Sequence, residues 1–200
     1  KPVGNTPSLL NFDQVSTLFH EFGHGLHGIL TNCKYRSLSG TNVARDFVEL
    51  PSQIMENWAC EPEVMKMYAK HYQTGEVIPD ELIKKIEAAG TYGQGFINTE
   101  LIAASLLDMD YHTITTPTQI ILPDFEDAAM AKIGLIPEII SRYKSTYFKH
   151  IFSGGYSAGY YGYTWAAVLD SDAFQAFKET SLFDATTAKS FRENILEKGN

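Results

Sequence analysis

The stretch from residue 13 to residue 30 shows the clearest structural pattern in the sequence. Its apolar side chains recur every three or four positions, which is the spacing of one face of an α-helix. They are Val15, Leu18, Phe19, Phe22, Leu26, Ile29 and Leu30. Asp13 stands where a helix N-cap is expected. Alternating apolar and polar residues, the mark of a half-buried strand, are scarce elsewhere, so the sequence predicts a mainly α fold.

Further helices are predicted along most of the remaining chain. By apolar spacing and helix-end signals they cover residues 45–60, 61–72, 79–89, 92–112, 125–133, 137–149, 157–178 and 184–197. Pro51 must lie in the first turns of its helix, because proline lacks the N–H that an interior turn uses. Residues 33–43 look extended and turn-rich, and are the expected place for a small β element. Residues 113–123 are a loop by composition.

Composition narrows the class of protein. The 200 residues are 44% hydrophobic and 20% charged, which is enough apolar material for a core and argues against disorder. The net charge of −8, without a Lys/Arg cluster, argues against nucleic acid or an anionic membrane as partner. No apolar run approaches the roughly 18 residues of a membrane span. Two cysteines are too few for a disulfide framework, which favours a reducing, cytoplasmic location; the oligomeric state stays unknown.

The segment His20-Glu21-Phe22-Gly23-His24 lies inside the first predicted helix. Residues four apart on a helix project from one face about one turn apart, so His20 and His24 can share one zinc ion. Glu21 lies about 100° round the helix from His20, where it can reach a metal-bound water and act as a general base. Two ordinary histidines on an amphipathic helix are the alternative interpretation.

A third ligand has to come from another part of the chain. Metzincin-type sites need a glycine three residues, and a histidine six residues, after the second histidine; here His27 and Leu30 occupy these positions. His27 shares a face with His20 but lies about 10.5 Å along the helix axis, so both cannot bind the same ion. His27 is expected either beside the site or in the packing. A di-iron centre needs two Glu-x-x-His pairs, and the sequence contains one.

Carboxylates that could complete the site lie between residues 46 and 58. Glu49 and Glu56 are seven residues apart and share a stripe, with Asp46 about 60° away. A solvated acidic face is the alternative, but apolar residues between these acids indicate a packed helix. One acid would bind the ion, and the others would orient its ligands. Two histidines and one carboxylate leave a fourth position for water, as in a catalytic zinc site.

A tyrosine-rich segment lies near the C-terminus. Tyr156, Tyr160 and Tyr163 are spaced to share one face of a helix, which would ordinarily be an aromatic packing stripe. The residues between them are small, and Gly154-Gly155 precedes them. A flexible loop of this kind could instead bring phenol hydroxyls over a metal site to bind a developing oxyanion.

These motifs together resemble the M3 family of zinc peptidases. The segments that carry the resemblance are Phe19–His24, Ser39–Thr41, Asp46–Glu49, Pro51–Gln53, Glu56–Trp58 and His150–Trp165. The resemblance runs from about Pro7 to the end, and the spacing from His150 to Tyr156 is closer to the peptidyl-dipeptidase branch. Family members run to several hundred residues, so residues 1–200 are expected to form one catalytic core cut from a longer chain.

The resemblance implies a multi-helix, zincin-like (gluzincin) catalytic domain with at most a small β element. It implies one Zn²⁺ per chain, and the implied ligands are His20, His24 and Glu49. Glu21 is then the base, while Asp46 and Glu56 are outer residues that orient the ligands.

The resemblance also assigns roles to the C-terminal segment. His150, Tyr156 and Tyr163 are expected to contact substrate or the transition state, and Tyr160 to bind substrate together with Tyr156. The implied activity is hydrolysis of short peptides, with release of C-terminal dipeptides as the finer prediction. The alternative is a non-catalytic, metal-free helical domain that binds peptides or serves as a scaffold, although the intact ligand and base positions argue against it.

Overall fold

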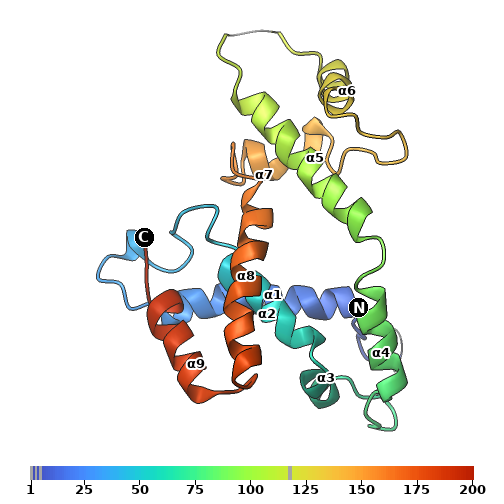
Figure 1. The fold of residues 1–200 in the computed structure, drawn as a ribbon, viewed down its shortest axis with the longest axis vertical. Helices are drawn as coiled ribbons and strands as arrows, with labels where there is room; N and C mark the ends of the chain where they lie inside the picture. Colours follow the sequence, from blue (N-terminus) through green and yellow to red (C-terminus); the bar gives the residue numbers. More distant parts are fainter. Residues whose placement is uncertain (1, 3, 5, 117–118) are drawn as a thin grey trace. The chain divides into compact units, whose positions relative to one another are not determined.

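The computed structural model describes residues 2, 4, 6–116 and 119–200, and these are mainly helical (Figure 1). The helices in chain order are α1 (Phe12–Leu30), η1 (Arg36–Leu38), α2 (Leu50–Cys60), α3 (Pro62–Tyr68), α4 (Asp80–Ala89), α5 (Gln94–His112), α6 (Leu122–Lys132), η2 (Ser145–Tyr147), α7 (Lys149–Phe152), α8 (Gly162–Glu179), α9 (Ala185–Phe191) and η3 (Arg192–Leu196). The described residues contain no extended strand, and an isolated antiparallel bridge joins Lys70 to Val77. The mainly α prediction is therefore confirmed.

The described chain divides into two compact units. Unit 1 contains Lys1–Ala44, Val48–Tyr92 and Ala166–Asn200, and unit 2 contains Arg45–Phe47 and Gly93–Trp165. The predicted β element at residues 33–43 is wrong, because a 3₁₀ turn and a β-turn occupy that segment of unit 1.

In unit 1, α1 and α2 pack against each other (Figure 1). The start of α1 is fixed by a capping box in which Asn11 and Gln14 each accept the other's backbone N–H. Asp13, expected as the N-cap, lies instead in the first turn. The α2 core is formed by Ile54, which is fully buried, with Trp58 and the aromatic residues of α8 and α9 around it.

Helix α2 begins at Leu50, five residues later than predicted. Pro51 occupies its first turn, as expected. A helix that ran through residue 51 from residue 45 would bring the proline ring against the carbonyl of residue 47. Residues 45–49 form turns instead, so Glu49 lies just before the helix rather than within it.

Unit 2 is built from α5, α6, α7 and the first turn of α8. Its core contains Ala104, Leu107, Ala129, Phe148, Ile151 and Tyr160. The predicted helix at 137–149 is wrong, because side chains capture the backbone groups that a helix would use. Ser141 Oγ donates to the Tyr143 carbonyl, and the buried Glu126 carboxylate accepts the N–H of Ser145.

Other helix ends also differ from the predictions. Helix α3 ends at Tyr68 instead of residue 72, and α8 starts at Gly162 instead of residue 157. The late start of α8 follows from Ala158, whose positive φ of 52° is incompatible with a helix. Residues 117 and 118 of the predicted 113–123 loop lie outside the described residues. Within the described chain, none of the helices has the length and apolar character needed to cross a membrane.

Candidate metal centre

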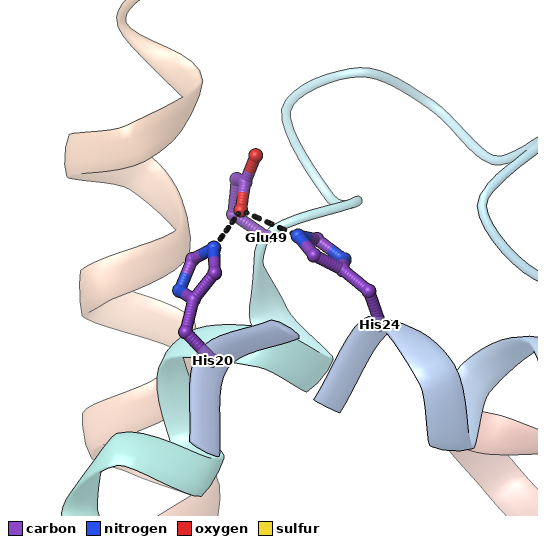
Figure 2. Close-up of side chains that lie close together, drawn as sticks. All are labelled: His20, His24 and Glu49. Atoms are coloured by element: carbon purple, nitrogen blue, oxygen red, sulfur yellow. Dashed lines mark ion pairs between the residues drawn. The ribbon is translucent and has the colours of Figure 1, made fainter. Parts of the chain in front are cut away.

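His20 and His24 project from the same side of α1, one turn apart, with ring centroids 5.0 Å from each other. Both Nε2 atoms point at one oxygen of Glu49, as Figure 2 shows. Oε2 of Glu49 lies 3.3 Å from Nε2 of His20 and 3.2 Å from Nε2 of His24. Unit 1 therefore gathers the three ligands expected from the sequence.

The spacing of these atoms suits a bound zinc ion. Ligand atoms about 2.0–2.1 Å from the centre of a tetrahedron lie about 3.3–3.4 Å from one another. The two measured separations, 3.3 and 3.2 Å, are close to that edge length. The ligand atoms of His20, His24 and Glu49 all lie within 4.8 Å of one another, and this is the one such cluster among the described residues. The set can hold a tetrahedral divalent ion with one position left open.

Glu49 is a buried carboxylate, with 3% of its surface exposed. Ser52 Oγ donates to its Oε2 across 3.0 Å and to its backbone carbonyl across 2.8 Å, which fixes the side chain at the start of α2. A carboxylate buried this deeply needs positive charge or several hydrogen bonds nearby. Its position favours a cation between the two imidazoles.

The other ring nitrogen of His20 is held by Glu56. Its Nδ1 lies 2.7 Å from Glu56 Oε1, and Ser16 Oγ donates to Glu56 Oε2 across 3.0 Å. A carboxylate oxygen accepts, so Nδ1 of His20 carries the proton and Nε2 is left as the metal-binding atom. Burial lowers the pKa of His20, but Glu49 and Glu56 more than offset this and raise it to about 9. The two carboxylates thus favour positive charge at this point.

Gly23 determines how closely the two helices approach. A Cβ at this position would lie 2.2 Å from the carbonyl oxygen of Pro51 and 2.6 Å from Cα of Ser52. The absence of a side chain therefore lets α1 touch the backbone of α2 directly beside Glu49. This contact brings His20 and His24 of α1 within reach of Glu49, which lies just before α2.

The remaining residues predicted around the metal lie in different environments. Glu21 is exposed, and no hydrogen bond joins its carboxylate to any described residue. His27 is fully buried, as expected for a packing residue, and burial lowers its pKa. Asp46 belongs to unit 2, where its carboxylate accepts a 2.8 Å hydrogen bond from the hydroxyl of Tyr161. Its role as an orienting residue stays a prediction.

Unit 2 gathers the residues of the tyrosine-rich segment, but not along a helix. The rings of Tyr156 and Tyr163 stack with centroids 5.2 Å apart, and His150 lies 6.3 Å from each. Tyr160 contacts the same rings but is 2% exposed and belongs to the core. Its substrate-binding role stays a prediction, as do the roles of His150, Tyr156 and Tyr163.

Three contributors to the site were missed from the sequence. Ser16 and Ser52 carried no signal, because a serine near a helix end usually serves the helix backbone. Gly23 did carry one: a glycine inside a helix costs about 1 kcal/mol relative to alanine, so it commonly marks a close approach of backbones.

Two histidines on one helix and a carboxylate just before the next helix define a class of metal-binding sites in which the ion keeps an open coordination position. The chain belongs to Peptidase family M3, whose profile matches residues 1–200. The family resemblance carried by the motifs is confirmed.

Three relatives illustrate the similarity. The chain is 46% identical over 202 residues to the dipeptidyl carboxypeptidase of Escherichia coli (strain K12) and 43% identical over 202 residues to oligopeptidase A of the same strain. It is 41% identical over 204 residues to the organellar oligopeptidase A, chloroplastic/mitochondrial, of Arabidopsis thaliana. These alignments cover 100%, 100% and 99% of this chain, but 30%, 30% and 26% of the three relatives. The chain therefore spans less than a third of their length.

Proposed function

We propose that the protein containing this chain is a zinc-dependent peptidase that hydrolyses short peptides, and that residues 1–200 belong to its catalytic core. The observation that carries the proposal is the convergence of His20 and His24 on the buried Glu49, at separations that suit a tetrahedral zinc ion. Membership of Peptidase family M3 supports a peptidase activity. The proposal assigns one Zn²⁺ to each chain.

A zinc ion held by His20, His24 and Glu49 would polarise the scissile carbonyl and lower the pKa of a bound water. Glu21 is the general base in this proposal: it takes the proton of the attacking water and passes it to the leaving amine. Its exposed carboxylate is next to His20 in the sequence and forms no hydrogen bond with the described residues, so its oxygens are available as acceptors. Glu56 keeps His20 in the tautomer that binds metal.

The tyrosine-rich segment supplies hydrogen-bond donors in the same proposal. His150, Tyr156 and Tyr163 form one aromatic cluster, and the two tyrosine rings are stacked nearly parallel at 15°. Hydroxyl groups held in this way can donate to the oxygen that becomes negative when the peptide carbonyl is attacked. Tyr160 is assigned to substrate binding together with Tyr156, and its buried ring packs against Tyr163.

Release of C-terminal dipeptides is the finer part of the proposal. It is supported by the 46% identity to a protein named dipeptidyl carboxypeptidase, while the oligopeptidase A relatives support hydrolysis of short peptides more generally. A cytoplasmic location is proposed as well, because Cys33 and Cys60 are free thiols.

The test uses the full-length enzyme, purified without chelators. Elemental analysis should find one zinc per chain, and a nonapeptide should be cleaved into pieces that mass spectrometry identifies. Glu21→Gln should retain zinc and lose turnover, whereas Glu49→Gln should lose zinc first because it removes an anionic ligand. Active enzyme without zinc would overturn the proposal, as would turnover that survives in Glu21→Gln. A metal-free, inactive full-length protein would favour the scaffold interpretation.

A further inference from the structure

Asp108 of α5 is a fully buried carboxylate of unit 2 that the proposed reaction does not use. Its Oδ1 accepts the backbone N–H of Ala158 across 2.9 Å, and its Oδ2 accepts the backbone N–H of Tyr160 across 2.9 Å. Nδ1 of His112, one turn further along α5, donates to the backbone carbonyl of Asp108 across 2.9 Å and lies 2.7 Å from Oδ1. Two backbone donors and the adjacent imidazole therefore surround a carboxylate that burial would otherwise make costly.

The backbone that Asp108 holds has an unusual conformation. Ala158 has a φ of 52°, the one positive φ among the described residues other than glycine. A left-handed conformation costs alanine free energy and persists where surrounding contacts determine it. The Asp108 carboxylate accepts hydrogen bonds from the N–H groups of this residue and of Tyr160. The carboxylate therefore fixes the turn between α7 and α8.

Other bonds close the same turn. Ser157 Oγ donates to the carbonyl of Ile151 across 2.6 Å, and the N–H of Gly154 donates to the carbonyl of Lys149 across 2.7 Å. The Arg45 guanidinium lies 5.1 Å from the ring centroid of Tyr156. The glycine pair at 154–155 thus makes a tight turn possible, and the expectation of a freely swinging loop does not fit these contacts.

We propose that Asp108 is a positioning residue for the phenol donor of Tyr163. The residues it binds lie between Tyr156 and Tyr163 in the chain, and Tyr160 packs directly against Tyr163, with ring centroids 5.1 Å apart. A turn held in this way keeps the hydroxyl in place before substrate arrives, so no reorganisation is needed during the reaction. The inference rests on the proposed function, in which that hydroxyl binds the oxyanion.

The first test measures the turn itself and needs no activity. Asp108→Asn keeps the side-chain shape but turns an NH₂ group toward one of the two backbone N–H groups. In the full-length enzyme, amide hydrogen exchange across residues 154–161 should become faster by about tenfold or more, because local opening becomes easier. Asp110→Asn is the matched control: it makes the same chemical change on the same helix, at a surface pair with Lys132, and should leave that exchange unchanged. Unchanged exchange in Asp108→Asn would overturn the inference.

The second test asks whether Asp108 acts through Tyr163. Asp108→Asn should lower kcat by about 10- to 100-fold, the effect of a misplaced group, with zinc content and KM nearly unchanged. In a Tyr163→Phe background the same change should lower kcat by less than about threefold, because residues that act together are not additive. Full multiplication of the two effects would contradict the positioning role.

Two outcomes separate this inference from the proposed function. Loss of kcat in Tyr163→Phe with full multiplication by Asp108→Asn would retain the proposed oxyanion role and reject the role of Asp108. Wild-type kcat in Tyr163→Phe would reject the oxyanion role, and the positioning role with it. If Asp108→Asn does not fold, His112→Ala removes the imidazole that lies beside the carboxylate, at a partly exposed position, and should give the same coupling with a smaller effect.

Discussion

Nδ1 of His20 lies 2.7 Å from Oε1 of Glu56, while its Nε2 faces the carboxylate of Glu49. One imidazole ring is therefore held between two acids, one before α2 and one within it. Ser16, one turn before His20 on α1, donates to the second oxygen of Glu56 and keeps it in place. The orientation of the ring is thus determined before any ion binds.

Replacement of Glu56 should weaken metal binding without removing a ligand. Glu56→Gln retains an oxygen that can accept from Nδ1 but loses the charge that makes His20 a stronger ligand, so zinc affinity should fall about 10- to 100-fold. Competition with a chelator of known affinity measures the change. Glu63→Gln, at an exposed position of α3, is the control and should bind zinc like the wild type. Equal affinities in the two variants would contradict the orienting role of Glu56.

A methyl group at residue 23 should disturb both stability and metal binding. In Gly23→Ala the new Cβ would meet the Pro51 carbonyl at 2.2 Å, so α1 and α2 must move apart. The cost should be about 1–3 kcal/mol of unfolding free energy, as for other overpacked sites, and zinc affinity should fall as the ligands separate. Urea unfolding and chelator competition measure the two effects.

Gly25 offers the matched control on the same helix, because a Cβ there would meet nothing within 4 Å. Gly25→Ala should stabilise the protein by up to about 1 kcal/mol through helix propensity and leave zinc affinity unchanged. Similar losses in both variants would show that helix α1 tolerates no side chain for some reason other than its contact with Pro51.

Removal of one phenol hydroxyl should affect the reaction more than the fold. Tyr163→Phe keeps the ring that stacks on Tyr156, so stability and zinc content should survive. Loss of an oxyanion donor typically lowers kcat by about 10²–10³-fold, and KM should change little because the contact forms in the transition state. Tyr147→Phe, at an exposed position, serves as control. A rise in KM alone would assign Tyr163 to substrate binding.

The stability of unit 2 should depend on pH through Glu126. Burial raises the pKa of this carboxyl, but hydrogen bonds from Ser145 and the ammonium of Lys144 outweigh burial and hold it below the usual 4.5. A lowered pKa means that the contribution to stability is present above about pH 4.5 and is lost as pH falls through the folded-state value. Urea unfolding of the wild type and of Glu126→Gln between pH 3 and pH 7 measures it. The difference between the two proteins should shrink toward low pH; a constant difference would contradict the assignment.

The sequence was sufficient for most of the helices and for placing His20 and His24 on one helix face, because both depend on spacing within short segments. Glu49 was singled out only by the family resemblance, and the ligand roles of all three residues stay predictions. The pair His20 and His24 needed one helix, and the helix at 79–89 had its own start and stop residues, which the structure retains as α4. Errors arose where backbone groups bond to distant side chains. Within residues 137–149, where a helix was expected, the N–H of Ser145 donates to Glu126 of another helix. No local sequence pattern identifies that partner.

The tyrosine-rich segment shows a second kind of limit. Spacing alone suggested one helical face for Tyr156, Tyr160 and Tyr163, and the rings do cluster, but through a turn. The left-handed Ala158 could not be foreseen, since alanine favours helices and only the buried Asp108 explains its conformation. Spacing identified tyrosines whose rings lie together but not the turn that brings them together, and their roles stay predictions.

The bare Cα of Gly23 makes positions 22 and 23, between Glu21 and His24, unequal. Phe22 is 54% exposed, so many side chains could occupy its place, whereas Gly23 meets backbone atoms that have no rotamer to change. A library randomised at both positions and selected for bound metal should therefore return a broad mixture at residue 22 and almost pure glycine at residue 23. The sequence of this five-residue segment is thus constrained by the close approach of the α2 backbone as well as by the chemistry of its candidate ligands.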